Sequence, residues 1–237
     1  MRCMRRIALI SDIHADLPAL DAALADIARL KIAERYCLGD LVGYGPDPSG
    51  VIARMRETGI PTVQGNYDDG VGNERGSCGC HYTTDEQRTA GAESYARTVA
   101  VLAADERAWL AALPWEIRLE HAGARVLLVH GSPRKVNEYL LPDRPDSVLA
   151  RLARDANADA VCVGHVHVPY HRSPAPGVHF VSAGSVGKPA GDDPRPCWVE
   201  LLLGQPREFA ELDSGDEAVG PVGRSRALLG IVVHRVG

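Results

Sequence analysis

The 237-residue sequence lacks any apolar run that approaches the ~18 residues needed to cross a membrane. It also lacks a strong charge of either sign, since its formal net charge is -5. So small an imbalance does not favour general binding to nucleic acid or to a membrane surface. The basic N-terminal residues lead into a short apolar stretch that Asp12, His14 and Asp16 interrupt, and no cleavage site of small residues follows. We therefore expect a cytoplasmic protein rather than a secreted one.

Cysteine is scarce as well, with six in a chain of this length, which excludes a disulfide framework as the basis of the fold. Cys37 and Cys162 lie in apolar, strand-like runs, where cysteine behaves as a small buried hydrophobe. Cys78 and Cys80 flank a glycine and precede His81, but no second pair supplies the spacing of a zinc site. We interpret this segment as a loop that shapes a pocket, with a disulfide or a third metal as lesser alternatives.

What the sequence does contain is the composition of an ordinary globular domain, with 45% hydrophobic and 24% charged residues. Its length suits one large α/β domain that buries a sizeable core. Apolar runs alternate with helical patterns in the first part of the chain, which predicts a largely parallel sheet. The predicted domain covers residues 1–213. Residues 214–237 form a tail whose apolar end, 228–233, either adds a strand or remains a loose end.

Hydrophobic periodicity and turn residues predict the individual elements. The expected strands are residues 5–11, 35–38, 61–64, 116–120, 125–129, 160–163, 179–182, 196–203 and 207–212. The expected helices are residues 17–30, capped by Asp16, then 51–57, 84–112 with a break near 104, and 146–156. Residues 69–82 are polar and rich in glycine, so we interpret them as an irregular loop at an active site.

Five clusters of polar side chains each follow one of the strand-like runs. They are Asp12 with His14, Asp40, Asn66, His130, and His165 with His167. In open α/β sheets, binding sites form just beyond the carboxyl ends of the strands. We therefore expect the five clusters to converge on one crevice.

These clusters have the chemistry of metal ligands. Two carboxylates, one amide and four imidazoles make a mixed set of nitrogen and oxygen donors without a thiolate. Such a set suits a borderline divalent ion, with Mn or Fe favoured and Zn as an alternative. Seven ligands are too many for one tetrahedral site, so we expect two divalent ions bridged by a carboxylate. The pair would lower the pKa of bound water toward ~7, and the resulting metal-bound hydroxide would attack phosphorus in line.

The same residues resemble a known enzyme family. Asp12-Ile13-His14, Gly39-Asp40, Gly65-Asn66, His130-Gly131 and Gly164-His165-Val166-His167 stand in the order seen in calcineurin-like metallophosphoesterases. The resemblance covers about residues 5–203 and is strongest to the small bacterial phosphodiesterases of that superfamily. It implies an α/β fold arranged as a four-layer α/β/β/α sandwich. It also implies one metal on Asp12, His14 and His167 and another on Asn66, His130 and His165, with Asp40 as the bridge.

The sequence departs from the family pattern directly after Asn66. The family usually has a His there, which is thought to stabilise the transition state or to protonate the leaving oxygen, and this chain has Tyr67. A phenol with a pKa near ~10 is a poorer proton donor at neutral pH than an imidazolium. Either the substrate has a good leaving group, or another residue such as His81 donates the proton, or activity is low. Tyr67 would still be able to donate a hydrogen bond to a phosphoryl oxygen.

The preferred hypothesis is a metal-dependent phosphatase or phosphodiesterase that hydrolyses a small phosphate mono- or diester, with a nucleotide as one candidate. Its predicted catalytic residues are Asp40, Asn66, Tyr67 and His130. Because Tyr67 replaces the usual His, the alternatives are a metal-binding scaffold, like the retromer scaffold subunit of the same superfamily, or a nucleotide sensor without turnover. The retained ligands argue against a pure scaffold. The remaining histidines, His121, His171, His179 and His234, are interpreted as surface or structural residues.

Overall fold

A computed structural model describes residues 4–204, 218–222 and 228–237. The strands are β1 (Arg5–Ile10), β2 (Glu34–Cys37), β3 (Ile117–His121), β4 (Ala124–Leu128), β5 (Ala160–Val163), β6 (Pro169–Ala175), β7 (Val178–Ala183), β8 (Cys197–Gly204), β9 (Ala218–Pro221) and β10 (Leu228–Arg235). The helices are α1 (Leu17–Arg29), α2 (Pro48–Thr58), α3 (Asn66–Gly72), α4 (Asp85–Val101), α5 (Ala104–Ala111) and α6 (Asp146–Asp155). Within these ranges, no helix combines the length and the apolar character of a membrane span.

The strands form two five-stranded sheets, which we call sheet A (order β2-β1-β8-β10-β9) and sheet B (order β3-β4-β5-β7-β6). The pairs β1–β2, β4–β5 and β5–β7 are parallel, and the other pairs are antiparallel. The prediction of a largely parallel sheet is therefore wrong. Parallel pairing of consecutive strands requires a long crossover connection. The short hairpins β3–β4 and β6–β7 lack such a connection, and the C-terminal strands β8, β9 and β10 also pair in antiparallel fashion.

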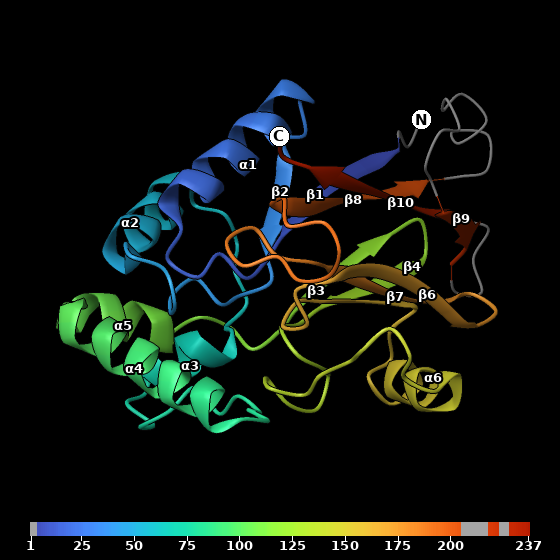
Figure 1. Ribbon diagram of the computed structural model, residues 1–237. Helices are drawn as coiled ribbons and strands as arrows, with labels where there is room; N and C mark the ends of the chain where they lie inside the picture. The colour runs from blue at the N-terminus through green and yellow to red at the C-terminus, as the bar shows by residue number, and fades with distance from the viewer. Residues whose placement is uncertain (1–3, 205–217, 223–227) are drawn as a thin grey trace.

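The alternation of side chains along the strands explains the layers of the fold. Leu9 of β1 and Leu128 of β4 are fully buried in the apolar core between the two sheets. Ile10, which points to the other face of sheet A, packs in the core formed with α1 and α2. Leu127, on the outer face of sheet B, packs in the core formed with α6. The chain is thus the expected α/β/β/α sandwich, with α1 and α2 on one outer face and α6 on the other (Figure 1).

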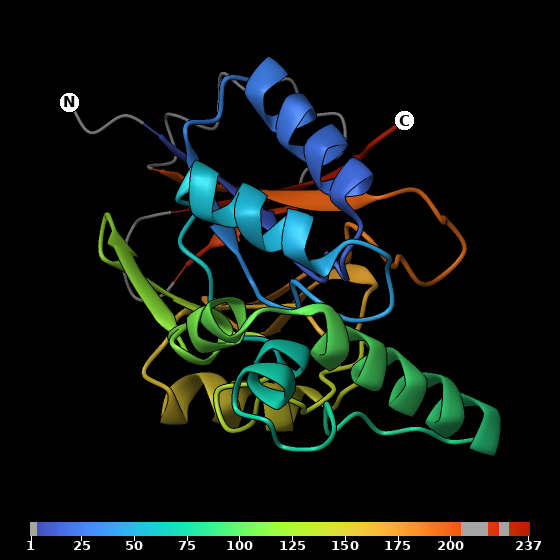
Figure 2. The same cartoon turned by 90° about the vertical axis from the view of Figure 1, so that its left-hand side faces the viewer.

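Helices α3, α4 and α5 form a second helical group beside the two sheets (Figures 1 and 2). Tyr67 and Val71 of α3 and Leu110 of α5 join the same apolar core as α1 and α2. The break predicted in the long helix is present, because α4 ends at Val101 and α5 begins at Ala104. The loop predicted for residues 69–82, however, overlaps the end of α3. This helix is only 7 residues long and contains two glycines, so it leaves no periodic pattern in the sequence.

Three further elements differ from the prediction. Residues 61–64 form no strand, since only Thr62 bridges to Cys37 before Gln64 turns away to bond the carbonyl of Pro114. Strand β6 was not predicted, because its prolines and polar residues suit only the edge of a sheet, and the structure has it there. Helix α2 begins at Pro48, earlier than predicted, because Asp47 caps it.

The C-terminal part of the chain completes sheet A. The apolar tail forms β10, which pairs with β8 along its whole length and with β9 on its other side. Leu229 and Ile231 of β10 add to the core between the sheets. The strand predicted for residues 207–212 lies outside the described residues.

We expect Leu9→Ala to lower the free energy of unfolding by about 2–5 kcal/mol, because it opens a cavity between the two sheets. Leu9 is 0% exposed there. Leu141→Ala is the matched control, since Leu141 is 47% exposed and its truncation should change stability by no more than about 0.5 kcal/mol. Urea unfolding followed by circular dichroism measures both values. Equal midpoints for the two variants would contradict the assignment of Leu9 to the central core.

Candidate metal centre

The predicted ligands other than Asn66 lie just beyond the ends of strands, as expected, whereas the strand predicted before Asn66 is absent. Asp12 follows β1, Asp40 follows β2, His130 follows β4 and His165 follows β5. Asn66 is the first residue of α3, and His167 lies in the short connection between β5 and β6. Six of the seven side chains are buried, and that of His167 is 14% exposed. Because β1–β2 and β4–β5 are parallel pairs, their carboxyl ends meet at one edge of each sheet and bring these side chains together.

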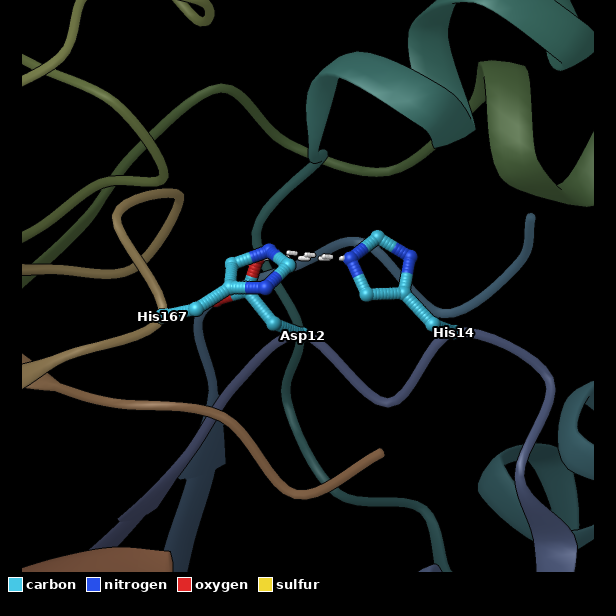
Figure 3. Close-up of side chains that lie close together, drawn as sticks. All are labelled: Asp12, His14 and His167. Carbon is cyan, nitrogen blue, oxygen red and sulfur yellow. Dashed lines mark hydrogen bonds and ion pairs between the residues drawn. The ribbon is translucent and has the colours of Figure 1, made fainter. Parts of the chain in front are cut away.

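Asp12, His14 and His167 form the first group of candidate ligands (Figure 3). The Nε2 atoms of the two imidazoles are 3.1 Å apart. Oδ1 of Asp12 lies 3.1 Å from Nε2 of His167 and 3.8 Å from Nε2 of His14. Three donor atoms at such separations surround a space of the size that one metal ion occupies.

Asp40, His130 and His165 form the second group. Nε2 of His130 lies 3.4 Å from Oδ2 of Asp40 and 3.0 Å from Oδ1 of Asn66, so the amide oxygen joins this group. The same Oδ2 of Asp40 is 3.8 Å from Nε2 of His14, which belongs to the first group. One oxygen of Asp40 therefore faces both groups, as a bridging carboxylate must.

Hydrogen bonds to the backbone fix three of the imidazole rings. Nδ1 of His14 lies 3.1 Å from the carbonyl of Val42, and Nδ1 of His130 lies 2.7 Å from that of Leu38. Nδ1 of His167 lies 2.7 Å from the carbonyl of Lys188. A carbonyl only accepts, so Nδ1 carries a proton in each ring, and Nε2 is the atom that each ring directs into the site.

The carboxylates and the amide are tied down in a similar way. Oδ2 of Asp12 accepts from Oγ of Ser11 at 2.6 Å and from the backbone N–H of His165 at 3.0 Å. Oδ1 of Asp40 accepts from the backbone N–H of Tyr67 at 2.8 Å. Each carboxylate therefore keeps its other oxygen for the site.

The Cys-Gly-Cys segment holds the amide of Asn66. Nδ2 of Asn66 donates to the carbonyl of Cys78 at 3.0 Å and lies 3.2 Å from Sγ of Cys80. These contacts orient Oδ1 of Asn66 toward His130. The segment thus positions a candidate ligand, in agreement with its interpretation as a loop that shapes the pocket.

Two buried polar atoms in the described part of the chain indicate that the site suits a cation. Oδ1 of Asp12 and Nε2 of His165 have no hydrogen bond of suitable geometry there. Buried polar atoms without such a bond are rare and call for a specific explanation. Both atoms face the candidate metal groups, and a carboxylate oxygen and an imidazole nitrogen are ordinary ligands of a divalent ion. The residues therefore fit the metals that the sequence predicts.

Burial sets the protonation of the imidazoles. It lowers the pKa of His14 and of His165 to about 4, so both rings are neutral at pH 7 and have a lone pair to offer. Burial also opposes a charge on His130, but the Asp40 carboxylate outweighs it and raises the pKa of His130 to about 9. A divalent ion on His130 would have to displace that proton.

The backbone is strained at several of the candidate ligands themselves. Five of the predicted ligands have φ in the left-handed region: Asp12 (52°), His14 (48°), Asp40 (54°), His165 (66°) and His167 (61°). Such conformations cost on the order of 1–3 kcal/mol for a residue with a Cβ and cluster at functional sites. They turn the side chains away from the strand direction and into the crevice.

Close packing explains two of the glycines next to ligands. A Cβ on Gly65 would lie 2.1 Å from the backbone nitrogen of Asp40, so only glycine lets these two loops touch. A Cβ on Gly164 would lie 2.7 Å from Oδ2 of Asp12, so glycine lets His165 approach the Asp12 carboxylate. The Gly-Asn and Gly-His pairs in the sequence thus reflect contacts between different ligand loops.

Asp68 is a buried residue to which the sequence analysis gave no role. Its carboxylate accepts backbone N–H bonds from Asp40 at 2.9 Å, from Leu41 at 3.0 Å and from Gly65 at 2.9 Å. It therefore joins the loop that carries Asp40 to the loop that carries Asn66. Burial and then the charge of Asp40 raise the pKa of Asp68 to about 7. The only signal in the sequence is its place two positions after the candidate ligand Asn66.

A cavity of about 430 Å³ opens onto the candidate ligands. Tyr67 forms part of its wall, is 0% exposed and donates its hydroxyl to Oγ of Ser94 at 3.4 Å. His81 is exposed and also lines the cavity. Tyr82, the last residue of the predicted active-site loop, lines the cavity too, and so do Tyr139 and Lys188, for which no role was predicted.

The other histidines lie away from this cavity and make contacts within the sheets. His171 and His179, on neighbouring strands of sheet B, stack with Nε2 of one 2.9 Å from Nδ1 of the other. His234 of β10 pairs with Glu200 of β8 at 3.1 Å. These contacts agree with the structural roles predicted for them.

The profile of the calcineurin-like phosphoesterase superfamily domain matches residues 4–202. This chain belongs to that superfamily. The resemblance inferred from the ligand motifs is thereby confirmed, and so is the fold that it implied. The family is typically dependent on divalent metals, and the two groups of ligands described above are where such ions would bind.

Individual relatives agree with this assignment. The chain is 32% identical over 200 residues to the uncharacterized protein MJ0912 of Methanocaldococcus jannaschii, a match that covers 77% of this chain and 76% of that protein. It is similar in structure to a metallophosphoesterase from Sphaerobacter thermophilus, with 25% identity, a TM-score of 0.66 and coverage of 99% and 88% of the two chains. The hypothetical protein PH1004 from Pyrococcus horikoshii shares the fold, with 20% identity, a TM-score of 0.70 and coverage of 98% and 87%.

We expect Asp68→Asn to destabilise the protein by about 1–3 kcal/mol. The NH2 group of the new amide replaces one carboxylate oxygen, so a backbone N–H that donated to that oxygen no longer has an acceptor. The substitution should also reduce metal binding, since the loops of Asp40 and Asn66 lose their common anchor. Asp69→Asn is the neighbouring control, because Asp69 pairs with Arg75 outside the site. Thermal unfolding and metal analysis after dialysis measure the two effects. Similar behaviour of both variants would contradict the anchoring role of Asp68.

Proposed function

We propose that the protein is a metal-dependent phosphoesterase that hydrolyses a small phosphate ester at a dinuclear centre. One observation carries the proposal: each candidate ligand keeps one donor atom for the site, and Oδ2 of Asp40 faces both groups. Structural hydrogen bonding alone does not account for Asp12 Oδ1 and His165 Nε2, which are buried without a suitable bond in the described part of the chain.

The residues would hold two ions as follows. Asp12, His14 and His167 would hold the first, His130, His165 and Asn66 would hold the second, and Asp40 would contribute to both. The donor set favours Mn or Fe, with Zn as an alternative. When bound, such a pair supplies an activated water for attack on phosphorus and positive charge for the phosphoryl oxygens.

The protein's own contribution is to pre-orient the ligands. The backbone carbonyls of Val42, Leu38 and Lys188 fix the rings of His14, His130 and His167, so the donor atoms need little reorganisation when ions and substrate enter. Within the second group, Oδ2 of Asp40 and Nε2 of His130 lie 3.4 Å apart, so the negative charge of Asp40 lies against the His130 ring.

Tyr67 occupies the position of the family's His, but its environment does not suit an acid. Burial first, and then the neighbouring Cys78, raise the pKa of Tyr67 well above its usual value. Its hydroxyl donates to Ser94, so its contribution in the described structure is to form the cavity wall next to His14, whose ring lies 5.6 Å away. We therefore propose a substrate whose leaving group departs without protonation by a strong acid. Such leaving groups are the aryloxide of an aryl ester or a second phosphate group.

Two single substitutions should each remove one ion. We expect His167→Ala and His165→Ala to reduce the bound Mn from about two ions to about one per chain, because each belongs to a different group. His171→Ala is the control, since His171 contacts His179 instead of the cavity. Metal analysis of protein stripped with chelator and reloaded with Mn measures the ratio. Loss of both ions, or of neither, would contradict the division of the ligands into two groups.

Hydrolysis of paired aryl and alkyl phosphates, both mono- and diesters, tests the function itself. We expect turnover of the aryl esters only after Mn is restored, and alkyl turnover about 10²–10⁴-fold lower, because general acid catalysis is missing. Tyr67→Phe should leave the aryl rate within about threefold if the hydroxyl only bonds Ser94.

Each other outcome has a definite meaning. Comparable aryl and alkyl rates would show that another group donates the proton, and His81→Ala then identifies whether His81 is that group. An absence of turnover despite two bound ions would overturn the proposal in favour of a scaffold or a nucleotide sensor.

A further inference from the structure

Lys188 lies at the wall of the cavity that contains the candidate metal ligands. Its ammonium nitrogen is 4.6 Å from the centre of the Tyr44 ring, and that ring lies 4.9 Å from the ring of His14. A cation over the face of an aromatic ring is held there by the ring's electron density. The charge of Lys188 is therefore kept close to the first group of ligands.

The backbone of Lys188 is fixed from two sides by that group. Its carbonyl accepts from Nδ1 of His167 at 2.7 Å, and its N–H donates to Oγ of Ser185 at 2.8 Å. Ser185 in turn donates to the carbonyl of Asp12 at 2.7 Å, and the N–H of Gly187 bonds the same carbonyl at 3.0 Å. These hydrogen bonds thus tie the backbone position of Lys188 to Asp12 and His167.

Lys188 also has no anionic partner in the part of the chain that the structure describes. No ion pair with a carboxylate is formed by its ammonium group there, although most arginines near the surface have one. Among the described side chains that line the cavity, Lys188 is the one lysine or arginine. A positive charge without an anionic partner in the described residues, at the wall of a cavity for which we propose a phosphate ester as ligand, suits an anionic oxygen of that ligand.

We propose that Lys188 binds the phosphate group of the substrate and makes the site selective for phosphate monoesters over diesters. The proposal rests on the proposed function and refines its substrate class. A monoester phosphate carries up to two negative charges at pH 7, whereas a diester carries one and has a substituent in place of a terminal oxygen. An extra fixed cation beside the metal centre therefore stabilises the monoester more.

The tyrosines of the cavity define the rest of the substrate. Tyr44, Tyr67, Tyr82 and Tyr139 line it, although the whole chain has only 7 tyrosines. Tyr44 packs beside His14 and bonds Tyr82 through their hydroxyl groups at 3.3 Å, while the Tyr139 ring lies 4.0 Å from that of His165. Partly exposed aromatic rings on both sides of the metal groups favour a flat ring in the alcohol part of the ester.

Kinetics of two variants at Lys188 test the selectivity. We expect Lys188→Met, which keeps an apolar chain over Tyr44, to lower kcat/KM for phenyl phosphate about 10- to 100-fold through loss of a charged hydrogen bond. For the diester bis-phenyl phosphate the loss should be less than about threefold, and Lys188→Arg should recover most of the monoester activity. Lys31→Met and Lys135→Met are controls, since both lysines are exposed and lie outside the cavity. Equal losses for the two esters, or no loss, would overturn the proposal.

A second measurement does not depend on turnover. Lys31, Lys135 and Lys188 are the lysines of the chain, so acetylation of each is resolved by peptide mass spectrometry. In the Mn-loaded protein, inorganic phosphate should slow acetylation of Lys188 and leave Lys31 and Lys135 unchanged. Unaltered labelling of Lys188 at saturating phosphate would overturn the proposal.

The kinetic and the acetylation experiments together distinguish failure of this proposal from failure of the proposed function. Ester hydrolysis that is indifferent to Lys188 would refute the proposal and leave the phosphoesterase intact. Protection of Lys188 by phosphate in a protein that hydrolyses neither ester would support the binding role and refute the enzyme.

Discussion

The cost of burying charge is the constraint on which the rest of this structure depends. Asp12, Asp40 and Asp68 are almost inaccessible to solvent and lie among four imidazoles. Carboxylates in such a place are stable only when each has hydrogen bonds or a cation. The backbone N–H groups around Asp68 and the donors to Asp12 and Asp40 provide the first, and the two candidate metal ions would provide the second.

The sandwich provides the rigidity that this arrangement needs. Two sheets packed through an apolar core bring the carboxyl ends of β1, β2, β4 and β5 to one crevice, and α1, α2 and α6 cover the outer faces. The left-handed residues at the ends of these strands are tolerated because tight contacts hold them, such as that between Gly65 and Asp40. Left-handed backbone and buried charge thus occur together at the edge where the chemistry is proposed.

Replacement of the family's His by Tyr67 fits this division of roles. A buried phenol bonded to Ser94 contributes shape to the cavity rather than a mobile proton. Under the proposed function, activity would depend on the charges that remain, which are the candidate metal ligands and Lys188 at the cavity wall. A site of this kind acts mainly by electrostatic stabilisation of a phosphoryl group, with little demand for proton transfer to the leaving oxygen.

The sequence alone determined the candidate ligands and the α/β class. Each ligand follows a short apolar run within a few residues, so local pattern and strand-end logic suffice to find Asp12, Asp40, His130 and His165. Strand pairing is different, because the order of the sheets and the placement of β10 beside β8 depend on contacts between residues far apart in the chain. Only the tertiary structure decided that Asp40 faces both groups, that Asp68 joins two ligand loops and that Lys188 reaches the cavity. The physical reason is that these roles arise from distances between loops, which a local sequence pattern does not encode.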